Sequence, residues 1–265
     1  MVAGGEDTSC AALAAGVVDE GQAMLSLGTA GTINLVQAAP ITHPRLLTFE
    51  HVLPGRWLLG GSMAAFGAAL EWCRRLLGDQ FSVESLGDLA ADAPPGAGGL
   101  VFLPYLSGEL QPINDGHARG AFVGLTLQHG PAHLTRAVME GAVFALAHNL
   151  HLAREAGGTV TELRASGGPT NSPHWCQMLA DITGVPLHLP TLTGGAPLGG
   201  ALLAAAGIET MDLGRWAKRE RPETVFRPHE NQELYQGLFQ VYRDLYPALR
   251  PSFHTLAAQD SQEMT

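Results

Sequence analysis

Residues 160–181 read VTELRASGGPTNSPHWCQMLAD, and this stretch decides the fold class. Its first six residues predict a strand, and the pair Gly167-Gly168 predicts a tight turn. Ser172 followed by Pro173 is typical of a helix start, because serine caps free backbone amides and proline fits the first helical position. A strand that runs through a glycine-rich turn into a helix is characteristic of α/β proteins. The stretch therefore predicts an α/β domain.

The same alternation of strands, turns and helices continues over the rest of the 265 residues. The 33 glycines and 17 prolines punctuate the apolar runs, as expected for an α/β domain with tight turns. One domain is expected over residues 1–255, and the small or polar residues 256–265 are expected to form a disordered tail. Strands are predicted at 23–27, 32–36, 47–52, 56–59, 100–103, 160–165 and 187–189, and helices at 10–15, 63–77, 131–156, 173–183, 197–206 and 230–249.

The charge of the chain narrows the classes of partner. Asp and Glu outnumber Lys and Arg by 25 to 15, so the formal net charge is −10. This balance disfavours nucleic acid and anionic membranes as partners. With 46% hydrophobic and 15% charged residues, the chain can bury a large core and does not belong to the disordered class. Lys218 is the single lysine, so a P-loop, whose glycines are followed by a lysine, is excluded.

Cysteine use and the pattern of apolar residues indicate a cytoplasmic protein. Cys10, Cys73 and Cys176 are odd in number and widely spaced, unlike a disulfide framework or a metal knuckle. The N-terminus has no basic region followed by an apolar run, so no secretory signal is predicted. Gly, Pro or polar residues interrupt every stretch of 18 residues, so no membrane span is expected.

Three short segments are candidates for binding or catalysis, and each also has a plainer interpretation. The turn at Gly167-Gly168 presents backbone amides at a helix start, where phosphate or heterocycle edges bind, or it is only a tight connection. The hairpin tip at residues 28–31 offers amides and the hydroxyl of Thr29 to phosphate oxygens, or it is an ordinary turn. Asp7 or Thr8 would cap a helix, and the helix dipole keeps Asp7 ionised, so that it can accept a proton from an attacking hydroxyl.

Two further sets of polar residues leave a metal site open without favouring one. His148, His151 and Glu155 share a face of the helix predicted at 131–156, where a solvated helix face is the favoured interpretation. Glu109 and Asp115 lie in the loop 107–120, where they would hold a metal, close over a site or cap turns. No residue is therefore assigned as a metal ligand.

Several segments, taken in order, resemble the FGGY family of carbohydrate kinases over nearly the whole chain. Residues 120–125 (GAFVGL) and 133–140 (HLTRAVME) look like its C-terminal signature, and residues 102–109 (FLPYLSGE) are similar to a segment typical of the xylulokinases within it. Residues 4–7 resemble the family's Gly-Gly-Gly-Asp motif, and residues 28–31 resemble its Gly-Thr-Ser-Gly hairpin. Residues 166–168 and 175–181 resemble its adenosine-side element, and residues 234–247 resemble the C-terminal end of its members.

The resemblance implies a ribonuclease-H-like domain of the actin-type ATPases, with a mixed sheet flanked by helices. It implies that Asp7 is the catalytic base of phosphoryl transfer from ATP, with Mg²⁺, to a ketose, most closely D-xylulose, which gives D-xylulose 5-phosphate. The alternatives are another sugar of the family (gluconate, ribulose or glycerol) or an inactive nucleotide-binding remnant. The residues that the resemblance places at the nucleotide are Gly28, Thr29, Gly31, Gly67, Glu71, Gly167, Gly168, Asn171 and Ser172.

The sequence also departs from the family pattern. Glu6 replaces a glycine beside the base, Ala30 replaces a serine of the hairpin, and Leu110 stands where xylulokinases usually have an arginine. In this family an N-terminal sugar-binding domain precedes the catalytic aspartate, whereas six residues precede Asp7. The resemblance therefore implies three partners, namely a ketose, ATP and a missing N-terminal kinase domain, and it leaves a homodimer open.

Overall fold

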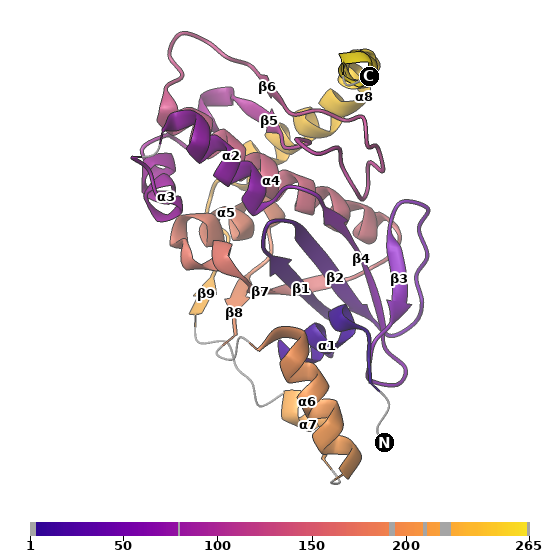
Figure 1. Ribbon diagram of the computed structural model, residues 1–265. Helices are drawn as coiled ribbons and strands as arrows, with labels where there is room; N and C mark the ends of the chain where they lie inside the picture. The colour runs from indigo at the N-terminus through magenta and orange to yellow at the C-terminus, as the bar shows by residue number, and fades with distance from the viewer. Residues whose placement is uncertain (1–3, 79, 191–193, 209–210, 218–223, 264–265) are drawn as a thin grey trace.

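The computed structural model describes residues 4–263, apart from 79, 191–193, 209–210 and 218–223 (Figure 1). Its main element is a seven-stranded mixed sheet with helices on both faces, which confirms the predicted fold class. The order across the sheet is β3-β4-β2-β1-β7-β8-β9. The strands are β1 (Gly21–Leu27), β2 (Gly31–Gln37), β3 (Leu47–Glu50), β4 (Trp57–Met63), β7 (Val160–Ser166), β8 (Leu187–Leu189) and β9 (Thr224–Phe226), and the separate pair β5 (Val101–Leu103) and β6 (Ala121–Val123).

The centre of the sheet joins a hairpin to a parallel pair of strands. β1 pairs antiparallel with β2, as predicted, and Leu27 lies opposite Gly31 at the tip. β1 also pairs in parallel with β7, with Ser26 opposite Ser166, and β7 pairs in parallel with β8. Since β1 and β7 run in the same direction, their carboxyl ends lie together at one edge of the sheet. In α/β folds this edge is where ligands bind.

Alternating side chains along the strands bury both faces of the sheet. Ala23 and Leu25 of β1 belong to the large core that α4 and α5 cover, whereas Met24, between them in sequence, packs with α1 on the other face. Figure 1 shows α2, α4 and α5 on one side of the sheet and α1 and α6 on the other. The helices are α1 (Asp7–Ala14), α2 (Gly67–Leu77), α3 (Val83–Ala91), α4 (Pro131–Glu155), α5 (Pro173–Thr183), α6 (Gly195–Ile208), α7 (Leu213–Ala217) and α8 (Gln232–Glu263), with 3-10 turns at Ala97–Gly99 (η1) and Gly168–Asn171 (η2).

The C-terminal helix corrects one prediction. α8 extends to Glu263, so residues 256–263 are helical and not the expected disordered tail; residues 264–265 lie outside the described part of the chain. Phe253 and Ala257 are buried, and Nε2 of His254 lies 2.7 Å from Oδ2 of Asp115. These contacts with the body of the protein stabilise the helix beyond the point at which its sequence turns polar.

The two-stranded sheet packs on α2 through aromatic rings. The ring centroids of Trp72 and Phe102 lie 5.7 Å apart in a stacked arrangement, and those of Phe102 and Phe122 lie 4.5 Å apart.

None of the helices in the described part of the chain combines the length and the apolar content that a bilayer crossing demands.

Candidate functional site

The glycine-rich turn after β7 lies against the end of β1. Gly167 has a φ of +115°, a conformation that favours glycine. A Cβ atom at this position would lie 1.8 Å from the carbonyl oxygen of Leu27, the last residue of β1. Only glycine therefore permits this close approach, which brings the two turns at the carboxyl ends of β1 and β7 together.

The hairpin tip in turn contacts the start of α2. The backbone N–H of Gly67 donates to the carbonyl of Gly28 at 2.9 Å, and that of Ala68 donates to the carbonyl of Thr29 at 3.1 Å. A Cβ atom at Gly67 would lie 2.6 Å from the carbonyl oxygen of Gly28. The helix predicted from residue 63 begins only at Gly67, because β4 continues through Met63, which pairs with Gly31 at the tip.

A cavity of about 160 Å³ lies between α2, α3, α4 and the start of α5. Leu70, Met139 and Trp175 form its apolar wall. Gly168, Asn171 and Ser172, three of the predicted nucleotide residues, form another wall, and the rim carries Asp88 and His174. Oγ of Ser172 accepts a hydrogen bond from the backbone N–H of Trp175 at 3.3 Å, which confirms it as the cap of α5.

Eight of the nine predicted nucleotide residues thus belong to three segments at one edge of the sheet. Glu71, on α2, is the exception. Its two carboxylate oxygens accept hydrogen bonds from Arg74, at 2.8 Å from Nε and 3.0 Å from Nη2. The wall of the cavity is formed by its neighbour Leu70.

Asp7 is the first residue of α1. The cap of this helix is Glu6 and not Asp7 or Thr8, because the carboxylate of Glu6 accepts a hydrogen bond from the N–H of Ser9 at 3.1 Å. Asp7 is exposed, and its Oδ1 accepts the N–H of Thr8 at 2.7 Å. Hydrogen bonds with Glu6 and with Thr8 hold the pKa of Asp7 below its ordinary value, so it is ionised at neutral pH. Within the described residues, these contacts of Asp7 are local and do not reach the glycine segments.

α1 is held in place from two sides. Oγ of Ser9 donates to the carbonyl of Glu50 on β3 at 2.7 Å. On the other side α6 lies directly against the backbone of α1, since a Cβ atom at Gly199 would lie 2.0 Å from the carbonyl oxygen of Cys10. The catalytic candidate therefore sits at the start of a firmly packed helix.

Among the possible metal ligands, His148 is buried, and Glu109 and Asp115 accept hydrogen bonds from groups of the protein. His148 is 8% exposed, so the expected solvated face is wrong for this residue, and burial lowers its pKa to about 3. Oε1 of Glu109 accepts the N–H groups of Ala64 at 2.8 Å and of Leu110 at 2.7 Å. Oδ2 of Asp115 accepts the hydroxyl of Tyr246 at 2.7 Å. In the described part of the chain no three His, Cys, Asp or Glu side chains form a group that could hold a metal.

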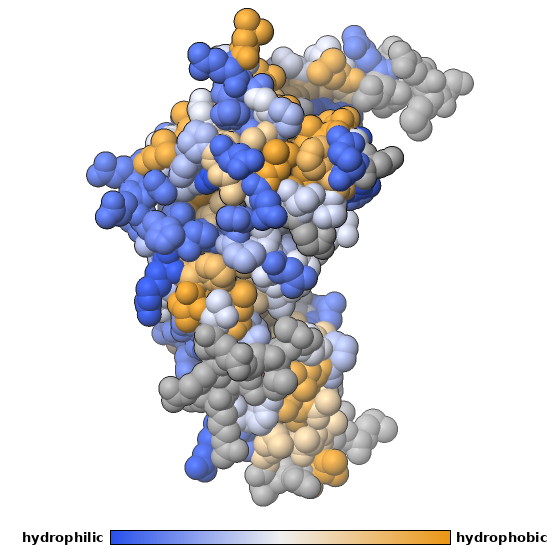
Figure 2. Space-filling view, turned by 90° about the vertical axis from the view of Figure 1, so that its left-hand side faces the viewer, coloured by the Kyte–Doolittle hydropathy of each residue, from blue (hydrophilic) through white to orange (hydrophobic). Residues whose placement is uncertain are grey.

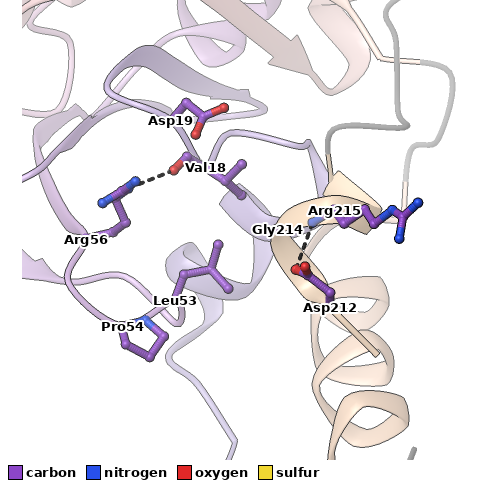
Figure 3. A pocket seen from close by; sticks show the side chains of 8 residues that line it. All are labelled: Val18, Asp19, Leu53, Pro54, Arg56, Asp212, Gly214 and Arg215. Atoms are coloured by element: carbon purple, nitrogen blue, oxygen red, sulfur yellow. Dashed lines mark hydrogen bonds between the residues drawn. The ribbon is translucent and has the colours of Figure 1, made fainter. Parts of the chain in front are cut away.

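Another hollow, of about 480 Å³, lies beyond the carboxyl end of α1 (Figure 3). Two of its polar side chains form hydrogen bonds with nearby backbone groups. Nε of Arg56 donates to the carbonyl of Val18 at 3.2 Å, and Oδ1 of Asp212 accepts the N–H of Arg215 at 3.0 Å. Figure 3 shows the guanidinium of Arg215 directed away from Arg56, so the charges of this hollow do not converge on a common point.

α3 is not among the helices predicted from the sequence, so Gly87 and Asp88, which line the cavity, were not predicted as site residues either. A signal was present in the two serines at its start. The N–H of Ser82 donates to Oγ of Ser85 at 2.9 Å, and the N–H of Ser85 donates to Oγ of Ser82 at 3.2 Å. This reciprocal pair is a capping box, although with serine at the position where glutamate or glutamine is usual.

The strand order β4-β2-β1-β7-β8, with glycine turns at the carboxyl ends of its parallel strands, defines the ribonuclease-H-like fold of the actin-type ATPases. The profile of the FGGY family of carbohydrate kinases, C-terminal domain, matches residues 23–208. The chain belongs to the FGGY family of carbohydrate kinases.

Individual relatives agree with this membership. The chain is 38% identical over 256 residues to the xylulose kinase of Escherichia coli. The aligned region covers 95% of this chain and 53% of that protein. It superposes on the xylulose kinase of Rhodospirillum rubrum with a TM-score of 0.86 at 34% identity, over 94% of this chain and 51% of that one. A gluconate kinase from Lactobacillus acidophilus gives a TM-score of 0.87 at 29% identity, over 94% and 52%. The chain thus spans about half the length of these relatives.

Proposed function

We propose that this chain is the nucleotide-binding half of a sugar kinase that transfers the γ-phosphoryl group of ATP to a ketose, D-xylulose. The observation that carries the proposal is the convergence of the hairpin tip, the start of α2 and the turn after β7 at the carboxyl ends of β1 and β7. Glycine turns at such an edge present backbone N–H groups to phosphate.

The residues present fit a nucleotide. A Cβ atom at Gly168 would meet no atom within 4 Å, and one at Gly28 would meet only the carbonyl oxygen of Ala30 at 3.8 Å, so the space beside both turns is open. Gly28, Thr29 and Gly31 would hold the phosphates, with Gly67 at the base of the tip. Gly167, Gly168, Asn171 and Ser172 would hold the adenosine beside the cavity. Glu71 stays a weaker candidate because Arg74 engages its carboxylate.

Asp7 would act as the base. The sugar hydroxyl gives its proton to the carboxylate of Asp7 while its oxygen forms a bond to the γ-phosphorus, and ADP leaves with the electron pair of the broken P–O bond. A carboxylate that is ionised at neutral pH, as its lowered pKa indicates, is ready to accept this proton. Mg²⁺ would enter with the nucleotide, because it is held largely by phosphate oxygens and water and neutralises their charge.

The proposed reaction needs more than this chain. The relatives are about twice as long, and the half of their length that the chain does not match would supply the sugar contacts. The similarity to a gluconate kinase keeps gluconate as the second candidate sugar. A homodimer and a cytoplasmic location stay proposals; the latter is supported by three free, buried cysteines.

Calorimetry with ADP, ATP and NAD tests the nucleotide half of the proposal. We expect binding of ADP and ATP but not of NAD, and no ADP production from ATP and D-xylulose by the chain alone. Absence of nucleotide binding would overturn the proposed function. Ketose-dependent ADP production by the pure chain would refute the requirement for a second half.

The catalytic role of Asp7 is tested with the N-terminal half of the E. coli relative supplied as a separate polypeptide. D-xylulose-dependent ADP production is expected in the mixture and should fall at least about 100-fold in Asp7→Asn. Glu20→Gln removes another exposed carboxylate and should leave the rate unchanged. Equal rates for Asp7→Asn and the unmodified chain would exclude Asp7 as the base.

A further inference from the structure

A buried ion pair lies on α4, the helix that supplies Met139 to the cavity, and none of the roles above includes it. Arg136 and Glu140 are 9% and 2% exposed, and Nε of Arg136 lies 2.7 Å from Oε1 of Glu140. Removing two charges from water costs about as much as their attraction returns, so such a pair adds little net stability by itself. Its contacts with other elements therefore indicate what it does.

The ion pair holds the C-terminal end of α3. Nη1 of Arg136 donates to the carbonyl of Ala90, in the last turn of α3, at 3.4 Å, and to that of Ala93, just beyond it, at 3.0 Å. A cation is favoured at this position, because the last carbonyls of a helix lack helical partners and carry partial negative charge. Oε1 of Glu140 accepts the N–H of Gly96, in the loop that follows, at 3.0 Å. The pair thus ties both α3 and the chain after it to α4.

The position of α3 sets the width of the cavity. Gly87 of α3 lines the cavity, and a Cβ atom at this residue would lie 2.8 Å from Oγ of Ser172 at the start of α5. α3 has only 9 residues, and so short a helix depends on tertiary contacts for its stability. The contacts of Arg136 at its C-terminal end are therefore contacts on which one wall of the cavity depends.

Tyr235 of α8 completes the network. Its side chain is 1% exposed, its hydroxyl donates to Oε1 of Glu140 at 2.8 Å, and it accepts a hydrogen bond from Nη2 of Arg136 at 3.1 Å. The nitrogens of the guanidinium thus contact three separate groups, namely a carboxylate, the carbonyls at the end of α3 and a phenol. A lysine keeps the charge at this position, but its single nitrogen cannot contact all three.

We infer that Arg136 is a positioning residue for nucleotide binding, because it holds α3 where this helix forms one wall of the cavity. The inference rests on the proposed function of the cavity as a nucleoside site. Arg136 acts through α3 and needs no contact with the nucleotide. When α3 is released, only a fraction of the molecules has the cavity formed, and the apparent affinity falls in proportion to that fraction.

Calorimetry with ADP on the full chain tests this role. Arg136→Lys should bind ADP about tenfold more weakly, which corresponds to a formed cavity in about one molecule in ten. Arg164→Lys is the matched control, since Nη1 of Arg164 donates to the carbonyls of Ala15 at 3.0 Å and Gly16 at 2.9 Å, at the end of α1 on the other face of the sheet. This control should keep the ADP affinity within about twofold.

Hydrogen exchange measures the release of α3 directly. The backbone amides of α3 should exchange faster in Arg136→Lys than in Arg164→Lys, and bound ADP should slow them again, because binding selects the molecules in which α3 is in place. Equal exchange of these amides in the two variants would overturn the action of Arg136 through α3.

A second pair of variants keeps both charges, and it decides the question if urea denaturation shows that Arg136→Lys is unfolded. Tyr235→Phe should weaken ADP binding by about threefold, since the network loses one member. Tyr242→Phe removes another buried hydroxyl of α8, one that accepts a hydrogen bond from Tyr105 at 2.9 Å, and should leave ADP binding unchanged. Lower stability alone does not change the affinity of molecules that stay folded, so a purely structural role predicts no difference between these two variants.

The possible results separate the two proposals. Unchanged ADP affinity in a folded Arg136→Lys, or in Tyr235→Phe if Arg136→Lys is unfolded, overturns the role of Arg136 while the nucleotide site stands. An equal loss of affinity in the matched control overturns it as well. If the unmodified chain does not bind ADP, the proposed function fails and the role of Arg136 fails with it.

Discussion

At the scale of single residues, the two adjacent glycines after β7 differ in what their surroundings permit. Gly167 combines a φ of +115° with a Cβ position 1.8 Å from a backbone oxygen of β1, so neither its conformation nor its space accepts a side chain. Gly168 has no atom within 4 Å of its Cβ position. The first glycine is therefore required by the fold, and the second leaves open the space that the proposed nucleotide would occupy.

Gly167→Ala should lower the free energy of unfolding by about 2 kcal/mol or more, because it adds backbone strain and a steric clash. Gly168→Ala should change it by less than about 1 kcal/mol and weaken ADP binding instead. Urea denaturation and calorimetry on both variants measure the two effects. Equal loss of stability in the two variants would contradict this distinction.

Glu109 is a buried acid that ties the loop 107–120 to the end of β4. It is 5% exposed, its Oε1 accepts two backbone amides, and its Oε2 has no partner among the described residues. Burial raises its pKa from 4.5 to about 7. The folded protein therefore holds this proton more tightly than the unfolded chain does. Its contribution to stability is lost as pH rises from about 4.5 through about 7.

Glu109→Gln should remove this pH dependence. Between pH 5 and pH 8 the unmodified chain should lose about 2 kcal/mol of unfolding free energy relative to the variant, as urea denaturation at both pH values would measure. Burial lowers the pKa of His148 from 6.5 to about 3, so this residue makes the folded protein less stable as the pH falls below 6.5. This opposite effect is the same in both proteins, because both contain His148. The difference between the two proteins therefore isolates Glu109, and parallel pH profiles would disprove its titration.

At the scale of elements, the packing of α6 on α1 fixes the helix that carries Asp7. Gly199 is buried and allows the two helices to meet at backbone distance, as the 2.0 Å separation of its Cβ position from the carbonyl of Cys10 requires. The next residue, Gly200, is exposed and has no atom within 4 Å of its Cβ position. The same substitution at these two adjacent glycines of α6 therefore compares a position in the helix contact with one outside it.

Gly199→Ala should push α6 away from α1, lower the unfolding free energy by about 2 kcal/mol and expose Cys10 to labelling by a thiol reagent. Gly200→Ala should instead raise stability by about 0.5–1 kcal/mol, since alanine is the better helix former at an exposed site. Urea denaturation and native-state thiol labelling measure both effects. Unchanged labelling of Cys10 in Gly199→Ala would show that the helices do not need this contact.

At the scale of the whole molecule, the chain exposes apolar surface where α6 lies. Figure 2 shows hydrophobic residues gathered in the lower part of the molecule, the place that α6 occupies in Figure 1. Ile208, at the end of α6, is 82% exposed. Since the chain matches about half the length of its relatives, we expect such surface to be covered when the other half is present.

The chain alone should self-associate, as measured by light scattering and sedimentation. Ile208→Asp should reduce the association, because it places a charge in the apolar patch. Leu127→Asp, at a fully exposed position in the loop between β6 and α4, should not. A monodisperse monomer across the concentration range would contradict the prediction.

Much of the fold could be predicted from local patterns. The hairpin at residues 28–31, the strand that begins at Val160 and the helices that begin at Pro131 and Pro173 carry strong turn and cap signals, and the structure has all four. α3 was missed because its capping box uses an atypical serine. The helix start at residue 63 was wrong because pairing of Met63 with Gly31, a contact distant in sequence, extends β4.

The sequence by itself determined the α/β class, the glycine turns and the family to which their order belongs, because each depends on residues that are neighbours along the chain. Only the tertiary structure decided that Gly167 must approach Leu27, that Glu71 is engaged by Arg74, and that Asp88 stands at the mouth of the cavity. Close approach, burial and the shape of a cavity arise when distant segments pack together, and no local pattern of residues records those distances.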